Sequence, residues 1–427
     1  MLEKIFHLKE KGTDIKQEFI AALVVFLSML YIIPVSSEIL SAAGMPKDAL
    51  ATSVILITIL STLAVGIYAN TPVAMSVGMG LNAYFAYGLV LGSGIAWQSA
   101  LGMVFLSGVV FLILSFSRFR VWILKSIPYD LKVALCVGLG AFLATIGFKG
   151  SGFFVINNGI LLLGDLGQTP TLLATLGVLL ILALSALKFK AAFILGIAVI
   201  SIIGFICGIA NTPEAFISLP ASISPIFLEL DIIGALQIAF LPAILTLMIT
   251  DLFDSLGTLS GIGIKSGTLQ DPEDREFTKT LQVDAAASAV GSIFGVSTTT
   301  AFLESAGGVA SGGRSGLVAV FVALFFCLTL FFLPLFLSIP SFAIYPVLVV
   351  VGCFMFLEIK RLDFSDTNAL IASFFMIILM PLTTSITNGL AAGFLVYLLL
   401  CVLNKEWGKI SGGLLLISVL SVLPFVL

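Results

Sequence analysis

"TPVAMSVGMGLNAYFAYG" (residues 71–88) and "GVSTTTAFLESAGGVASGG" (residues 295–313) are the two stretches that decide the fold of this chain. Each begins with residues that form helices poorly and then becomes helical in composition. Non-helical backbone leaves N–H and C=O groups unpaired, so inside a membrane it must be buried in protein or line a cavity. We therefore expect two half-helices, each preceded by a short extended piece, and we expect the two extended pieces to pair.

The rest of the chain has the composition of a membrane protein. Of its 427 residues, 59% are hydrophobic and 10% are charged, whereas a soluble domain carries roughly 25% charged residues. The polar N-terminus lacks the apolar core and cleavage site of a signal peptide. We predict an all-α polytopic membrane protein whose surroundings are the lipid bilayer, with no nucleic acid as a partner.

Apolar windows long enough to cross the bilayer, together with tilted and broken segments, predict fourteen transmembrane segments. The predicted segments are 17–41, 49–69, 72–91, 96–117, 130–148, 170–187, 191–210, 236–258, 281–295, 297–311, 315–337, 340–357, 366–384 and 386–403. The third and tenth segments are the broken ones.

The basic residues agree with this count. If the N-terminus is cytoplasmic and each segment crosses once, only Lys47 and Lys149 of the 20 lysines and arginines fall outside. That distribution is what the positive-inside rule expects. Both termini are then cytoplasmic, and the loop 211–235, which has no lysine or arginine, is external.

The same loop divides the segments into seven and seven. Because seven is odd, the second half enters from the opposite side, so related halves form an inverted repeat. The predicted organisation is a cytoplasmic tail 1–16, a first repeat 17–210, an external linker 211–235, a second repeat 236–404 and a C-terminal tail 405–427. Broken segments at corresponding positions of inverted halves point to the binding site of a transporter.

Polar side chains lie where the two half-helices are expected to begin. They are Asn82 in the first stretch, and residues 297–300 and Glu304 in the second. Helix N-termini offer free N–H donors and a partial positive charge, so a polar solute could be held there. The threonines could instead bond to helix carbonyls, Asn82 could join two helices, and Gly78 and Gly80 could serve close packing.

Two further acids lie in "TLMITDLFDSLGTLSG" (residues 246–261). A carboxylate at the bilayer centre costs roughly 2.5 to 3.5 kcal/mol, and no lysine or arginine lies at matching depth. We therefore expect Asp251 and Glu304 to face a cavity, with Asp254 on the same helix face as Asp251. Asp284, near the start of its segment, is interpreted as a structural or interfacial partner.

The sequence does not indicate a metal site, a cofactor or an enzyme. The five cysteines stand alone in apolar runs without pairing or metal-ligand spacing. His7, the only histidine, lies in the tail, so proton chemistry inside the membrane must use carboxylates. No G-x-G precedes Asp254 or Asp284, as an intramembrane aspartyl protease requires, and a serine protease needs an intramembrane histidine.

Four motifs carry a family resemblance: "SAAGMPKDA", "MSVGMGLNAYFAY", "TDLFDSLGT" and "STTTAFLESAGGVASGGRSGL". From about residue 17 to residue 405, the chain resembles the AzgA-like purine permeases. These belong to the second family of nucleobase:cation symporters, in the xanthine/uracil permease superfamily. The resemblance implies a core domain (segments 1–4 and 8–11), a gate domain (segments 5–7 and 12–14) and a bacterial inner-membrane location. A homodimer is also the family expectation.

The resemblance also implies a function and a site. The expected activity is import of adenine, guanine or hypoxanthine with protons, by alternating access. Family substrate-binding positions carry over to Asn82, Asp251 and Glu304, with Gly80 and Asp254 supporting them. We add three neighbours of the expected base to the substrate site: Thr299, Thr300 and Phe302. Proton coupling would fall to Asp251, Glu304 and Asp254. Relatives that carry uracil or xanthine have a glutamate where this chain has Asp251.

Two alternative functions keep the same architecture. Inorganic anion transporters share this fold, but two acids at the site argue against an anion. A channel needs no coupled carboxylate. The preferred purine and the choice between H+ and Na+ stay open, and we expect the apolar tail 411–427 to lie along the membrane or to pack on the gate.

Overall fold

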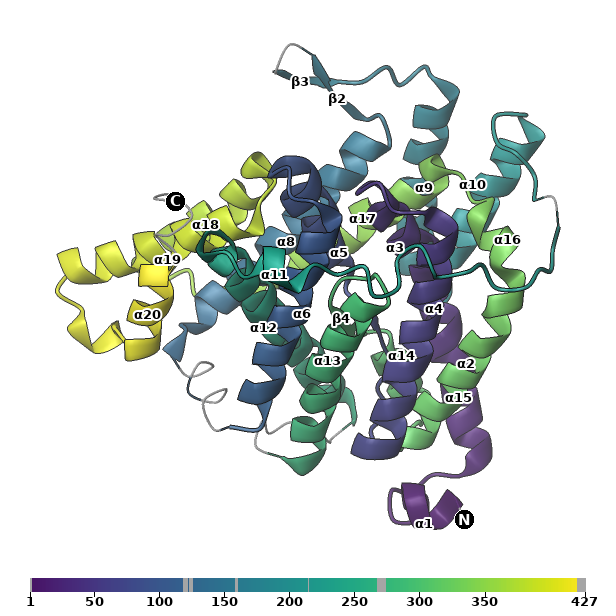
Figure 1. The fold of residues 1–427 in the computed structure, drawn as a ribbon, viewed down its shortest axis with the longest axis horizontal. Helices are drawn as coiled ribbons and strands as arrows, with labels where there is room; N and C mark the ends of the chain where they lie inside the picture. The colour runs from purple at the N-terminus through teal and green to yellow at the C-terminus, as the bar shows by residue number, and fades with distance from the viewer. Residues whose placement is uncertain are drawn as a thin grey trace.

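The computed structural model describes residues 2–117, 122, 126–157, 160–213, 215–266 and 274–420 of a largely helical protein (Figure 1). By length and composition, nine helical stretches in this part of the chain could each cross a membrane. They are Ile15–Ser41, Lys47–Ala69, Trp97–Ser115, Tyr129–Gly150, Thr169–Ala186, Ile238–Gly263, Leu317–Leu337, Ser341–Arg361 and Ile386–Leu403. Each coincides with a predicted segment.

The remaining predicted segments are broken, shorter or less apolar. Segments 72–91 and 297–311 contain strands, as expected. Segments 191–210 and 366–384 correspond to the shorter apolar helices α10 (Ala192–Ile206) and α18 (Thr367–Thr383). Segment 281–295 belongs to α13 (Arg275–Ile293), which begins earlier than predicted, in charged sequence.

The first half contains the following elements: α1 (Leu2–Phe6), α2 (Ile15–Met29), α3 (Ile32–Ser41), α4 (Lys47–Ala64), the π-helix Val65–Ala69, β1 (Met75–Val77), α5 (Met79–Ala83), the π-helix Tyr84–Gly92, α6 (Trp97–Ser115), α8 (Tyr129–Gly150), β2 (Phe154–Asn157), β3 (Ile160–Leu163), α9 (Thr169–Ala186) and α10. The second half contains α11 (Ile232–Ala235), α12 (Leu241–Ser266), α13, β4 (Thr299–Ala301), α14 (Ser305–Ala310), α15 (Gly316–Thr329), α16 (Leu333–Leu337), α17 (Ser341–Phe356), α18, α19 (Ile386–Leu403) and α20 (Gly412–Leu420).

The extended pieces of the two halves pair, which confirms the expectation from the sequence. β1 and β4 form an antiparallel sheet with the register Met75↔Ala301, Ser76↔Thr300 and Val77↔Thr299. The ladder continues at both ends, where Gly78 N–H donates to the Thr298 carbonyl (2.9 Å) and Phe302 N–H donates to the Ala74 carbonyl (3.0 Å). Backbone groups that the broken helices leave free are thus paired inside the protein.

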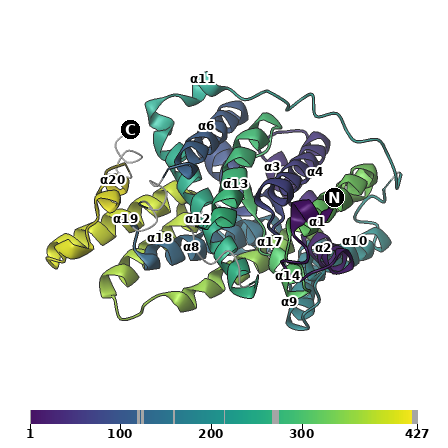
Figure 2. The same ribbon diagram turned by 90° about the horizontal axis from the view of Figure 1, so that it is seen from below.

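The long helices pack in two sets. One set contains α2, α3, α4, α6, α12, α13, α14 and α15, and the other contains α8, α9, α10, α17, α18 and α19. Helices of each set contact one another more extensively than they contact the other set. In both views α12 and α13 lie near the middle, with α18 to α20 on one side and α9 and α10 on the other (Figures 1 and 2).

Side-chain caps fix several helix ends. Asp14 accepts the N–H of Gln17 at the start of α2 (2.8 Å). Glu18 is fully buried and accepts the N–H of Arg314 (2.8 Å) and the hydroxyl of Ser315 (2.6 Å) at the start of α15. These bonds satisfy free donors at a helix N-terminus and tie α2 to α15, so the charge of Glu18 has a structural explanation.

Two connections differ from a simple helical pattern. Strands β2 and β3 pair as an antiparallel hairpin between α8 and α9, which the sequence analysis did not predict. The predicted external linker 211–235 includes α11, and its described part crosses the face of the molecule from α10 toward α11 (Figure 1). Backbone bonds from Ser218 to Phe331 (3.0 Å) and from Leu228 to Ile293 (2.9 Å) hold it.

Candidate functional site

The paired strands β1 and β4 bring the predicted site residues together. Asp251, on α12, is fully buried beside β4, and its Oδ2 accepts the hydroxyl of Ser288 on α13 at 2.8 Å. The same Ser288 Oγ accepts the backbone N–H of Thr299 at 2.9 Å. One serine therefore joins α12, α13 and β4 at the carboxyl group.

Asp254 faces the same strand one turn further along α12. Its Oδ2 accepts the hydroxyl of Thr300 at 3.2 Å, and the side chain is partly exposed. Ser255 Oγ lies 2.9 Å from the Thr300 hydroxyl and is 3.4 Å from the N–H of Ala301. Thr300 thus links Asp254 to β4, whereas the hydroxyl of Thr299 donates to a helix carbonyl, that of Asp284 in α13, which is the alternative considered for the threonines.

Asn82, in α5, lies where the first half-helix begins. It is fully buried, and its Oδ1 accepts the hydroxyl of Ser297 at 2.5 Å. Among the described residues, no partner exists for Asn82 Nδ2, for Thr298 Oγ1 or for Asp251 Oδ1. Buried polar atoms are nearly always paired, so three unpaired atoms around one short sheet indicate a place for a polar ligand.

Glu304 lies at the start of the second half-helix. Its Oε1 accepts the hydroxyl of Tyr31 at 2.7 Å. The neighbouring Phe302 is buried, as are Tyr84 and Phe85 of the first broken segment. The arrangement provides a carboxyl group and apolar rings near the paired strands.

Asp284, on α13, is also part of this region. It is fully buried, and neither carboxyl oxygen has a hydrogen-bond partner in the described part of the chain. It precedes Ser288 by one helical turn, and its main-chain carbonyl accepts the hydroxyl of Thr299 at 3.2 Å. The ion pairs between described residues include none of Asp251, Asp254, Asp284 and Glu304.

Gly80 lies where α5 packs closely against α8. A Cβ at this position would lie 2.7 Å from a methyl carbon of Leu139, on α8. The absence of a side chain therefore lets α5 approach α8 closely, which is the packing alternative considered for this residue.

Sequence reasoning did not single out Tyr31 or Ser288. A tyrosine before a proline-containing helix and a serine within an alanine-rich helix are common in membrane proteins, so neither carries a recognisable signal. Both act through tertiary contacts, from α13 and from the segment between α2 and α3, and no spacing in the chain indicates these contacts.

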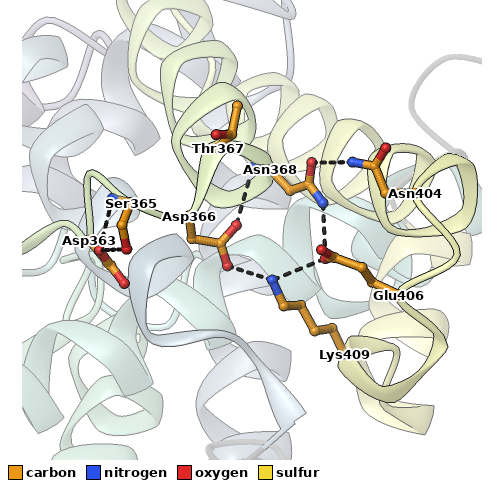
Figure 3. A pocket seen from close by; sticks show the side chains of 8 residues that line it. All are labelled: Asp363, Ser365, Asp366, Thr367, Asn368, Asn404, Glu406 and Lys409. Atoms are coloured by element: carbon orange, nitrogen blue, oxygen red, sulfur yellow. Dashed lines mark hydrogen bonds and ion pairs between the residues drawn. The ribbon is translucent and has the colours of Figure 1, made fainter.

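A separate polar cluster lies at the surface around the start of α18 and the segment after α19 (Figure 3). Lys409 Nζ lies 2.8 Å from Asp366 Oδ2 and 3.0 Å from Glu406 Oε2. Asn368 donates to Glu406 (3.0 Å) and accepts from Asn404 (2.7 Å). Most of these polar groups are paired with one another, so the cluster is best explained as a structural contact that joins α18 to the end of α19.

The part of the chain that the structure describes contains no group of three or more His, Cys, Asp or Glu residues suited to a metal ion. The five cysteines are free thiols: Cys136, Cys207, Cys327, Cys353 and Cys401.

Known proteins with similar sequences are permeases. Adenine permease AdeQ of Escherichia coli is 37% identical over 367 residues, which cover 86% of this chain and 82% of AdeQ. Guanine/hypoxanthine permease PbuO of Bacillus subtilis is 36% identical over 377 residues, which cover 85% of this chain and 86% of PbuO.

Among solved structures, the transmembrane domain of the cyanobacterial bicarbonate transporter BicA has a similar fold. The TM-score is 0.67 at 15% identity, and the match covers 88% of this chain and 97% of that domain. At this identity the likeness concerns the fold alone. The apolar helices and the similarity to the permeases above indicate an integral membrane protein. Residues 16–391 match the Permease family of xanthine and uracil permeases (Xan_ur_permease), and the chain belongs to that family.

Proposed function

We propose that this protein is a secondary transporter that imports adenine, guanine or hypoxanthine together with protons. Relatives named for adenine and for guanine/hypoxanthine, each matched over more than four fifths of this chain, support the substrate class. The observation in this chain that carries the proposal is the set of unpaired atoms around β1 and β4: Asn82 Nδ2, Thr298 Oγ1 and Asp251 Oδ1.

These atoms suit the edge of a purine. A purine edge alternates ring N–H donors with nitrogen and oxygen acceptors. A carboxylate such as Asp251 accepts N–H, the amide of Asn82 donates to a ring acceptor, and Glu304 supplies a second acceptor. Buried polar groups without hydrogen-bond partners destabilise the protein. A ligand that forms hydrogen bonds with them removes this cost, which favours binding.

Carboxyl groups are the candidates for proton coupling. His7, the only histidine, lies outside the predicted membrane segments, whereas Asp251 and Asp284 are fully buried and Asp254 lies one turn from Asp251 on α12. An unpaired carboxylate is expensive in an apolar interior, so taking up a proton and taking up a base become linked events. In this proposal Asp251 and Glu304 hold the base and the proton, and Asp254 modifies their titration.

The two sets of helices support alternating access as the mechanism of this proposal. We assign α2 to α6 and α12 to α15 to a core that carries the site, and α8 to α10 and α17 to α19 to a gate. The proposed topology has fourteen segments in two inverted halves of seven, with both termini cytoplasmic in a bacterial inner membrane. The antiparallel pairing of β1 with β4, one strand from each half, supports this symmetry. We propose a homodimer as the assembly.

Uptake into vesicles tests the proposal. The purified full chain is reconstituted in liposomes, and uptake of labelled adenine, guanine, hypoxanthine, uracil and sulfate is measured with and without a pH gradient, in the presence and absence of Na+. Purine accumulation that needs the pH gradient and not Na+ is expected. Accumulation of sulfate but of no purine would instead identify an anion transporter, and downhill flux of any solute without coupling would identify a channel. Purine uptake that needs Na+ would support the proposed substrates and contradict proton coupling.

A further inference from the structure

Tyr31 occupies a break between two helices. α2 ends at Met29 and α3 begins at Ile32. Pro34, in the first turn of α3, has no N–H to donate to the carbonyl of Leu30, so a continuous helix is interrupted there. The interruption places the side chain of Tyr31, which is fully buried, between the site and the neighbouring set of helices.

The two ends of the tyrosine side chain make different contacts. The hydroxyl donates to Glu304 Oε1 at 2.7 Å. The ring lies against Phe193 of α10, with 4.8 Å between ring centroids and 40° between the planes. Phe193 in turn meets Phe354 of α17 edge-on at 6.2 Å. One residue therefore joins a carboxyl group at the site to two helices of the other set.

Lys190, just before α10, makes two more contacts between the sets. Ser28 Oγ donates to the carbonyl of Lys190 at 2.8 Å, and Lys190 Nζ donates to Ser311 Oγ at 2.7 Å. Ser28 lies in α2 and Ser311 follows α14 directly. The segment that leads into α10 thus contacts the core at α2, next to Tyr31, and at the end of α14, the half-helix that begins after Glu304.

We propose that Tyr31 is a positioning residue that orients the Glu304 carboxyl for the substrate, and that its contact with Phe193 makes this orientation depend on where α10 lies. The inference rests on the proposed function. With Oε1 held by Tyr31, Glu304 presents Oε2 to a ligand donor. A shift of α10 that displaces the tyrosine ring removes the bond and frees the carboxyl group. Substrate affinity and the position of the gate are then linked through one side chain.

Two substitutions separate the hydroxyl from the ring. Tyr31→Phe keeps the ring and its packing on Phe193 but removes the hydrogen bond. Phe193→Leu keeps the hydrogen bond but removes the ring contact. Tyr397→Phe, at a buried tyrosine of α19, is the control for loss of a buried hydroxyl elsewhere. Purine affinity of the purified full chain is measured from pH 5 to pH 8 for each variant and for the double variant.

We expect Tyr31→Phe to weaken purine binding by at least threefold and to move its pH dependence, and Phe193→Leu to weaken it by a smaller factor. Because both changes act through the same carboxyl group, Phe193→Leu should have no further effect in the Tyr31→Phe background. The proposal would be overturned if Tyr31→Phe left purine binding unchanged at every pH. It would also be overturned if the loss of affinity in the double variant equalled the product of the losses in the two single variants.

A second readout does not depend on the substrate. The infrared carbonyl band of protonated Glu304 is assigned by its loss in Glu304→Gln, and a change of hydrogen bonding shifts it. We expect the band to shift in Tyr31→Phe and in Phe193→Leu, and to stay in place in Tyr397→Phe. If the parent protein binds no purine, the proposed function fails while this band still tests the role of Tyr31. A band that both Tyr31→Phe and Phe193→Leu leave in place refutes that role.

Discussion

Ser288 donates its hydroxyl hydrogen to Asp251 Oδ2 at 2.8 Å and accepts the backbone N–H of Thr299 at 2.9 Å, so the carboxyl group and the strand hold each other in place. Asp251 is therefore part of the scaffold as well as the proposed titrating group. Substitutions of Asp251 and of Ser288 can separate these two roles.

Asp251→Asn keeps size and hydrogen-bonding capacity but removes titration. We expect it to abolish purine accumulation driven by a pH gradient, while exchange of labelled for unlabelled purine across the vesicle membrane persists. Ser288→Ala, the matched variant, leaves the carboxyl group titratable and should retain accumulation at a rate lowered about 2- to 10-fold, as the loss of one hydrogen bond predicts. Accumulation by Asp251→Asn at the parent level would exclude Asp251 as the proton carrier.

Asn82→Ala removes an amide whose Oδ1 is held by Ser297 and whose Nδ2 is left for a ligand. We expect purine affinity to fall by about 0.5 to 1.5 kcal/mol, the usual range for a neutral hydrogen bond. Ser297→Ala serves as the comparison because it removes the neighbour of Asn82 and keeps the free donor. Equilibrium binding and gel filtration are measured on both variants, and an equal loss in the two would assign Asn82 to the scaffold.

Asp254→Asn tests the acid that bonds Thr300 rather than Ser288. Removing a negative charge makes it easier for neighbouring carboxyl groups to ionise, so the pH profile of uptake should move toward lower pH by up to about one unit. The maximal rate should change less than the profile. Thr300→Val, which leaves the charge of Asp254 in place, should move the profile less. A profile that shifts only in Thr300→Val would contradict this assignment.

Gly316→Ala tests the contact between the π-helix Val65–Ala69 and α15. A Cβ on Gly316 would collide with the carbonyl oxygen of Gly66, and a Cβ on Gly66 would lie 2.7 Å from the carbonyl oxygen of Gly316. We expect the substitution to lower the free energy of unfolding by about 1 to 3 kcal/mol, as overpacking does. Gly257→Ala, in α12 with nothing near its Cβ position, is the control and should be neutral or stabilising by about 0.5 to 1 kcal/mol. Thermal unfolding in detergent distinguishes them.

Lys409→Met tests the polar surface contact that joins α18 to the end of α19. Partial burial opposes ionisation of Asp366, but bonds from Lys409 and from helix N–H groups outweigh it and lower the pKa of Asp366. The bonds to Asp366 and Glu406 raise the pKa of Lys409. A lowered acid pKa adds stability above the acid's ordinary pKa, and this contribution disappears as the pH falls through the folded-state pKa.

The expected loss in Lys409→Met is about 0.2 to 1 kcal/mol at neutral pH, since solvent reaches both partners of the ion pair, whose side chains are 42% and 23% exposed. The difference in unfolding temperature between parent and variant should shrink as the pH falls below the ordinary pKa of an aspartate and through the lowered pKa of Asp366. A difference that stays constant from pH 7 to pH 3 would mean that the stem of Lys409, and not its charge, holds the two segments together.

Much of the architecture could be predicted because lipid imposes strict rules on sequence. Stretches such as 130–148 and 386–403 must be helical, since no water is present to satisfy their backbone. The pairing of 75–77 with 299–301 followed from the same rule applied to the broken segments. The hairpin of β2 and β3 could not be predicted, because short apolar strands at a helix end have the same composition as the helix.

The sequence by itself determined that the chain is a membrane protein, that segments 72–91 and 297–311 break, and which carboxyl groups have no basic residue at their depth. These properties are local. They can be recognised from the sequence because burying unpaired polar groups in lipid costs free energy. Only the tertiary structure decided how the residues meet: that Ser288 holds Asp251, that Tyr31 holds Glu304, and that the unpaired Asp284 carboxyl lies beside β4. Such contacts join helices far apart in the chain, and they depend on helix rotation and packing, which residue spacing does not specify.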